Sequence, residues 1–164
     1  MKHLMRRRAL VQKLIAGLSM LGIADGVWAA PVTLPAADSL PTALVTALQA
    51  KQPLVVMVSL HGCSFCKVVR ENYLHPLRDT GLPIVQIDMR DSRNMVDFDG
   101  STITQDAWVR KYGIKLAPTV LFFGSQGREV AARLIGAYLP DFYASYLDEQ
   151  LLVARQAVVK LKQV

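Results

Sequence analysis

The sequence predicts an α/β fold in which a mixed four-stranded sheet carries helices on both faces. Two segments, Leu54–Leu60 and Leu82–Met89, are almost entirely apolar, which is typical of strands buried on both faces. The segment between them has a helical pattern, so we expect the two strands to be parallel. Further along, Val120–Phe123 and Glu129–Ile135 flank a glycine-containing turn, which predicts an antiparallel hairpin.

The first 29 residues are predicted to be a secretory signal peptide. A basic start (Lys2 and Arg6 to Arg8) precedes a short apolar run, Leu14–Ala24, and small residues lead up to a cleavage site after Ala29. An uncleaved membrane anchor is the alternative, although the apolar run is short for a bilayer span. Residues 30–37 are expected to form an extended lead-in, and residues 38–164 to form one domain.

The basic character of the chain comes mostly from this leader. Residues 1–29 hold five of the 19 basic and one of the 13 acidic residues, so the remainder has a formal net charge of +2. No run of like charges marks a nucleic-acid or membrane-surface site in the remainder. We therefore expect export to the periplasm and no nucleic-acid partner.

Two helices before the second strand are predicted from residues that cap or break a helix. Asp38 is expected to cap a helix that reaches about Gln52, with Pro41 tolerated in its first turn. A second helix begins at the cysteine pair and reaches about Leu74, where Pro76 would break or kink it.

Downstream of the second strand, residues 90–103 are expected to be a long polar loop. Thr104 or Thr102 then caps a short helix, Gln105–Tyr112, that closes at Gly113. The last helix is predicted over Phe142 to about Leu161. Its expected buried stripe consists of Phe142, Tyr146, Leu147, Leu151, Ala154, Val158 and Leu161.

The chemistry of the sequence concentrates at Cys63 and Cys66, its two cysteines. Two residues separate them, and they lie at the junction between the first strand and the second helix. A bridge this short closes almost no loop, so stabilisation is a poor reason for it and redox chemistry is a better one. A position at a helix N-terminus favours the Cys63 thiolate. Cys63 is thus the expected nucleophile and Cys66 the expected resolving residue.

The cysteine pair has two rival interpretations. The pair could form a permanently oxidised bridge, or it could hold Cu(I) or Zn(II) together with His61 or His75. A structural zinc site needs four ligands, and the Asp97–Gly100 segment lacks the spacing and the closing glutamate of a calcium loop. We therefore expect no metal and no cofactor.

A second stretch adds a family resemblance. Tyr112-Gly113-Ile114 followed by Ala117-Pro118-Thr119 and an apolar strand, and then Gly136-Ala137, resembles the cis-proline region of the thioredoxin-like superfamily. The similarity spans about Leu40–Leu152, and with the leader it is greatest to exported bacterial members of the periplasmic SoxW and disulfide-reductase type. The resemblance implies a thioredoxin fold, a cis Pro118, and pairing of the Ala117 backbone with an extended substrate.

The chain departs from the family at several positions. Met57 stands where many thioredoxins carry a buried acid, Gly62 replaces a tryptophan, and the residues between the cysteines are Ser64 and Phe65. Phe65 is a candidate substrate contact. His61 and Lys67 are possible modulators of the Cys63 thiolate, with solvated side chains as the alternative.

These observations predict an exported thiol–disulfide oxidoreductase that reduces disulfides of other exported proteins and draws electrons from a membrane donor. The inter-cysteine Ser64-Phe65 pair lacks the histidine of strongly oxidising relatives, which favours the reductive direction. A disulfide oxidant or isomerase, and a non-enzymatic copper- or thiol-binding module, are the alternatives. A monomer is expected.

Overall fold

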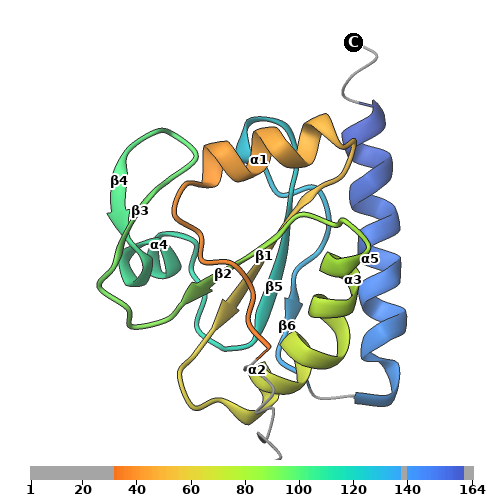
Figure 1. Ribbon diagram of the computed structural model, residues 1–164, viewed down its shortest axis with the longest axis horizontal. Helices are drawn as coiled ribbons and strands as arrows, with labels where there is room; N and C mark the ends of the chain where they lie inside the picture. Colours follow the sequence, from red (N-terminus) through yellow and green to blue (C-terminus); the bar gives the residue numbers. More distant parts are fainter. Residues whose placement is uncertain (1–31, 138–139, 161–164) are drawn as a thin grey trace, which may run out of the picture. The chain divides into compact units, whose positions relative to one another are not determined.

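A four-stranded mixed sheet with the strand order β2-β1-β5-β6 forms the centre of the protein (Figure 1). Strand β1 (Leu54–Ser59) is parallel to β2 (Ile84–Asp88) and antiparallel to β5 (Thr119–Phe123), and β6 (Leu134–Ile135) lies antiparallel to β5. The computed structural model describes residues 32–137 and 140–160, so the predicted signal peptide lies outside the described residues. The predicted fold class is confirmed.

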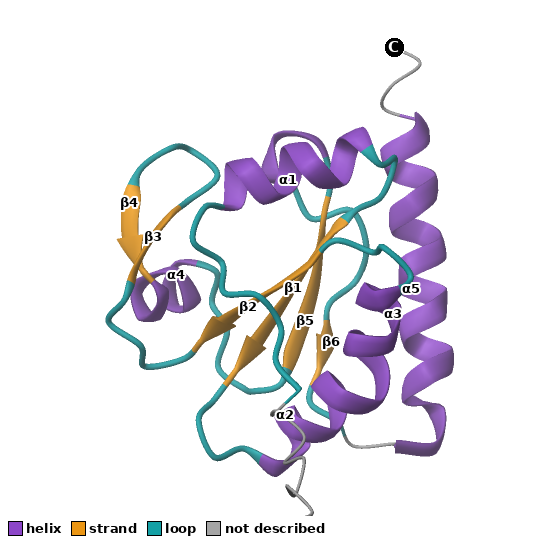
Figure 2. Cartoon of the chain, in the orientation of Figure 1, coloured by secondary structure: helices purple, strands orange, loops and turns teal. Residues whose placement is uncertain are grey.

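Strand β1 is buried along its whole length and divides its side chains between two cores. Val55 and Met57 belong to the core under α2 (Ser64–Val69) and α5 (Pro140–Lys160). Leu54, Val56 and Val58 belong to the core under α1 (Leu40–Gln49) and α4 (Gln105–Lys111). Figure 2 shows α4 and α5 on opposite sides of the sheet. The alternation of a buried strand thus supplies both cores.

The segment that enters the domain lies against the outer edge of β2. Ala36 forms a parallel bridge with Gln86, the Ala37 N–H donates to the Gln86 carbonyl, and the Gln86 N–H donates to Pro35. Helix α1 follows, but Ser39, not Asp38, is its cap, and the helix ends at Gln49. The Ser39 hydroxyl accepts from the Thr42 N–H, because the cap must lie directly before the first helical residue.

The helix after the cysteines does not end at Leu74. It passes through a π-helical segment, η1 (Arg70–Leu74), and continues as α3 (His75–Asp79) up to Thr80. Pro76 has no N–H to donate, and a wider turn in which the His75 N–H reaches the Arg70 carbonyl precedes it. Because Pro76 then lies in the first turn of α3, the chain remains helical instead of breaking.

The predicted loop over residues 90–103 contains a two-stranded hairpin, β3 (Asn94–Val96) and β4 (Thr102–Thr104). The loop prediction was wrong here because tertiary contacts, not strand-like composition, order this segment. The Met95 side chain is buried in the core under α1 and α4, and the Thr104 hydroxyl caps α4 as one of the two predicted options.

Asp97 ties this hairpin to α4. Its carboxylate is almost completely buried and accepts the Trp108 indole N–H at 3.0 Å, the Phe98 N–H at 2.7 Å and the Lys111 ammonium at 2.5 Å. The hydrogen bond to Asp97 raises the pKa of Lys111. A buried carboxylate is costly unless it is hydrogen-bonded, so the three donors to Asp97 hold the hairpin and α4 together.

The hairpin that follows β5 is shorter than predicted. Only Leu134–Ile135 forms β6, while Glu129 makes a single bridge to Phe123 and a 3₁₀ turn, η2 (Ser125–Gly127), connects the two sides. Gly127 has a φ of 64°, and a Cβ there would lie 2.4 Å from the Phe98 ring. The close approach of the residue-98 loop therefore requires glycine at this turn.

At the start of helix α5, the residues that face the core differ from the predicted ones. Tyr143 is buried, whereas Phe142 and Tyr146 are 58% and 46% exposed. Leu147, Leu151, Ala154 and Val158 are buried as expected, and Leu161 lies outside the described residues. None of the helices in the described ranges is both long and apolar enough to span a membrane.

Replacing Asp97 with alanine should destabilise the fold. The buried Trp108 N–H would lose its acceptor, which costs about 1–3 kcal/mol in the free energy of unfolding. Urea unfolding measures this loss. Asp99→Ala is the matched control, because Asp99 also contacts Lys111 but is exposed. Equal stability of the Asp97 variant and the wild type would contradict the anchoring role.

Tyr143→Phe should leave the protein as stable as the wild type or more stable by up to about 1 kcal/mol, because the buried hydroxyl has no hydrogen-bond partner among the described residues. Burial raises the pKa of Tyr143, so the unfolded chain loses the tyrosine proton first, and the free energy of unfolding of the wild type falls as the pH rises above about 10. Urea unfolding at about pH 8 and about pH 11 should therefore show a smaller alkaline loss in the variant. A less stable variant at both values would contradict this account.

Candidate active site

The turn after β1 presents Cys63 at the surface. The strand ends at Ser59, and the Cys63 N–H returns to the Leu60 carbonyl at 3.1 Å. Gly62 has a φ of 75°, a conformation that side chains rarely adopt. Glycine at position 62, where the resembled family has tryptophan, thus allows the positive φ of this turn.

Cys63 is the N-cap residue of α2 and is joined to Cys66 by a disulfide, with the two Cα atoms 5.2 Å apart. The Cys66 N–H points at the Cys63 sulfur over 3.1 Å. After reduction, this N–H and the helix dipole would stabilise negative charge on Cys63. Cys63 is half-buried and Cys66 only 1% exposed, so an attacking partner can reach Cys63 alone.

Cys66 is surrounded by the apolar core. Met57, Val69 and Leu74 share its cluster, and all members of that cluster are apolar side chains or tyrosine. Met57 is itself fully buried on the same face of β1. The one buried carboxylate among the described residues, Asp97, binds Trp108 of the other core. The departure from the family at Met57 therefore leaves Cys66 without a carboxylate from the described residues, which suits the neutral thiol or the disulfide.

Ala117 and Pro118 lie next to Cys63, in the segment just before β5. The Ala117 carbonyl oxygen is 4.0 Å from the Cys63 sulfur, and the Ala117–Pro118 peptide bond is cis. The Pro118 carbonyl accepts the Gly136 N–H at 2.7 Å, which holds this turn against β6. The backbone of residue 117 is therefore next to the reactive sulfur.

The remaining predicted site residues lie around Cys63 in different ways. Phe65 is 59% exposed on the first turn of α2, so it can contact a partner. His61 and Lys67 are exposed and line a cleft beside Cys63. His75, the other histidine considered as a ligand, pairs with Asp79 on α3 at 3.2 Å.

The cleft has a volume of about 1070 Å³ and reaches from Cys63 to the end of β2. The outer face of α2 and η1 forms one wall, the loop after β2 forms the other, and Thr33 of the lead-in borders it. Its charged lining consists of Lys67, Arg70, Asp88, Arg90, Asp91 and Arg93. Four cations therefore face two carboxylates.

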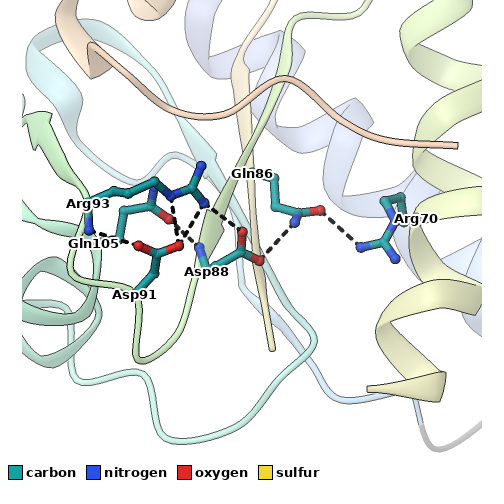
Figure 3. Close-up of polar contacts among 6 residues, drawn as sticks. All are labelled: Arg70, Gln86, Asp88, Asp91, Arg93 and Gln105. Carbon is teal, nitrogen blue, oxygen red and sulfur yellow. Dashed lines mark hydrogen bonds and ion pairs between the residues drawn. The ribbon is translucent and has the colours of Figure 1, made fainter. Parts of the chain in front are cut away.

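A chain of polar side chains crosses this cleft (Figure 3). Arg70 donates to the Gln86 amide oxygen at 3.1 Å, and the Gln86 amide nitrogen donates to Asp88 at 2.8 Å. Asp88 also pairs with Arg93 at 3.2 Å, and Arg93 donates to Asp91 at 2.8 Å. The Arg93 backbone N–H lowers the pKa of Asp91, and Asp91 raises that of Arg93.

Sequence reasoning missed this cleft. Arg70 looked like an ordinary residue of the cysteine helix, and Gln86 and Asp88 looked like the polar end of a strand. One signal was present: Asp88 ends a strand parallel to β1, and such strands end at the same edge of the sheet. This rule, applied to the sequence, would have brought Cys63 and Asp88 to the same edge of the sheet.

The residues and fold of the site fit thiol–disulfide exchange. One sulfur is reachable and stabilised as an anion by a helix N-terminus, and the second is close enough to displace a partner. Among the described residues, no three histidine, cysteine, aspartate or glutamate side chains gather around a common point.

A family model described as "Thioredoxin-like domain" matches residues 40–151, more than half of the chain. No curated protein matches the sequence.

Solved thioredoxin structures resemble the chain at low identity. A thioredoxin h from poplar is 20% identical, with 66% of this chain and 85% of that chain covered and a TM-score of 0.46. A thioredoxin-fold protein from Helicobacter pylori is 18% identical (70% and 86% covered, TM-score 0.43), and the periplasmic thioredoxin SoxS from Paracoccus pantotrophus is 19% identical (63% and 99% covered, TM-score 0.41). The match of the family model, together with the sheet order and the Cys63–Cys66 pair, shows that the chain belongs to the thioredoxin-like domain family.

Proposed function

We propose that this protein is an exported thiol–disulfide oxidoreductase that reduces disulfides in other exported proteins. The observation that carries the proposal is the unequal placement of the two sulfurs, with Cys63 reachable at a helix N-terminus and Cys66 buried behind it. Thiol–disulfide exchange needs this asymmetry, because one sulfur attacks and the other resolves.

The cycle begins with both cysteines reduced. The Cys63 thiolate attacks one sulfur of the substrate disulfide, and the other substrate sulfur leaves as a thiolate that takes up a proton. The Cys66 thiol then loses its proton and attacks the Cys63 sulfur, which releases the second substrate thiol. Two electrons pass to the substrate, and the Cys63–Cys66 disulfide is formed.

Substrate positioning is assigned to the residues around Cys63. The Ala117 backbone is 4.0 Å from the reactive sulfur and can pair with an extended substrate segment as an added strand. Phe65 offers an exposed apolar contact next to the motif. Both lie where a polypeptide that reaches Cys63 would pass.

The reductive direction and the location are part of the proposal. The basic leader with a cleavage site after Ala29 supports export to the periplasm. Ser64 and Phe65 place no histidine between the cysteines to stabilise the reduced form of a strong oxidant. A reductase in an oxidising compartment must be reduced again after each cycle, so a dithiol donor at the membrane is implied.

The Cys63→Ser variant should reduce insulin disulfides no faster than the uncatalysed reaction, because it lacks the attacking thiolate. Cys66→Ser should retain the attack but accumulate a mixed disulfide with the substrate, which non-reducing electrophoresis and mass spectrometry detect. Equal insulin reduction by Cys63→Ser and the wild type would refute Cys63 as the nucleophile.

The equilibrium with glutathione should give the Cys63–Cys66 pair a reduction potential near the thioredoxin end of the scale, about −270 mV. A value near about −120 mV would instead identify a disulfide oxidant and overturn the proposed direction. Alkylation of the free thiols followed by mass spectrometry measures the reduced fraction at each glutathione ratio.

A further inference from the structure

The cleft beside Cys63 contains a cation, Arg70, for which the described residues provide no counter-ion. Arg70 is partly buried, and its one hydrogen bond among the described residues goes to the neutral amide of Gln86. Its Nε atom is buried and has no partner in this part of the chain. A guanidinium carries five N–H donors, and a buried charge is normally paired with an acid. Arg70 is therefore suited to a carboxylate supplied by a ligand.

The carboxylates of the cleft are already committed elsewhere. Asp88 and Asp91 both pair with Arg93, and the Gln86 amide stands between Asp88 and Arg70 (Figure 3). Neither Lys67 nor Arg90, the other two cations of the lining, forms an ion pair within the described residues. The cleft thus keeps a positive excess next to the reactive sulfur.

Arg90 adds an independent observation at the rim of the cleft. Its φ is 63°, a conformation that glycine adopts more easily than a residue with a side chain. An exposed arginine is held there at a conformational cost, although nothing within the described fold pairs with it. Lys51 and Gln126 share this conformation outside the cleft, but residues of this kind cluster at active sites and ligand clamps, and Arg90 is the one of the three that lines the cleft.

The position of the cleft defines what it can bind. Because β2 and β5 flank β1 on opposite sides, the cleft and Ala117 lie on opposite sides of the turn that carries Cys63. A segment of the lead-in already occupies the backbone edge of β2 at Gln86, so recognition in the cleft must use side chains rather than an added strand. A polypeptide attached to Cys63 would place residues that flank its cysteine in this cleft.

We propose that the cleft is a second substrate-binding site, in which Arg70 and Arg90 hold acidic side chains that flank the reactive cysteine of a protein substrate. This inference rests on the proposed function and names its substrate class: disulfide-bonded polypeptides with aspartate or glutamate close to the attacked sulfur. The partly buried Arg70 would donate hydrogen bonds to a substrate carboxylate, and the exposed Arg90 would attract that carboxylate by its charge at the rim of the cleft.

The test uses three peptides of equal length, each with one intramolecular disulfide flanked by aspartate, asparagine or lysine. Their reduction by the full-length reduced protein is followed under single-turnover conditions. We expect the aspartate peptide to be reduced about tenfold faster than the asparagine peptide at limiting concentration, and the lysine peptide more slowly than both. Raising the ionic strength from about 0.02 M to about 0.5 M should reduce this preference, because salt screens the charges.

Two variants assign the preference to the cleft. Arg70→Gln should remove most of the ratio between the aspartate and asparagine peptides. Arg90→Gly removes the rim charge and suits the local backbone, so it tests the proposal even if Arg70→Gln folds poorly. Arg78→Gln is the matched control, because it removes the same charge from an exposed position on α3 outside the cleft. It should keep the full ratio.

The outcomes separate this inference from the proposed function. If none of the peptides is reduced faster than by Cys63→Ser, the oxidoreductase itself is refuted. If all are reduced at equal rates, or the preference survives in both arginine variants, the oxidoreductase stands and the acidic-substrate site is overturned. Oxidised glutathione is the last probe. If the protein reduces it faster than the aspartate peptide, and if this advantage is lost in Arg70→Gln, the cleft binds glutathione. The proposal of a polypeptide substrate is then overturned.

Discussion

The burial of β1 on both faces is the constraint on which the rest of the structure depends. Every residue of Leu54–Ser59 is buried, and its side chains alternate between two cores that lie under different helices. A strand of this kind needs a neighbour on each edge and a covering layer on each face, because its backbone and side chains have no contact with water. The parallel β2, the antiparallel β5 and the flanking helices meet these needs.

The active site lies where this burial ends. After Ser59 the chain leaves the sheet, turns at Gly62 and starts a helix, so Cys63 remains at the surface and Cys66 enters the core one turn later. The difference in exposure between two identical side chains thus follows from their positions along one helix. Met57, which belongs to the same hydrophobic cluster, helps keep the surroundings of Cys66 apolar. Proton exchange at Cys66 must therefore involve water or a substrate group instead of a neighbouring acid.

The two sides of Cys63 differ in chemistry. On the β5 side, the site offers backbone: the Ala117 carbonyl lies near the sulfur at the start of β5. On the β2 side, it offers charge, from a network that runs between Arg70 and Arg93 and in which no described carboxylate pairs with Arg70. Backbone pairing accepts many sequences, whereas charged side chains select among them. A site with both can combine a general reaction with a preference for certain substrates.

The sequence alone determined the parts of the protein that depend on local pattern. The apolar strand, the position of Cys63 and Cys66 at its end, the parallel crossover and the start of α4 at Gln105 all followed from hydrophobic period, caps and turns, although Thr102 and Thr104 both remained possible caps of α4. The structure decided what depends on partners distant in sequence. The β3–β4 hairpin is held through the bonds of Asp97 to Trp108 and Lys111, and Tyr143 rather than Phe142 faces the core because of how α5 is rotated on the sheet. The charged cleft also depends on residues distant in sequence, since Arg70, Gln86 and Arg93 come together only when the sheet and its helices pack.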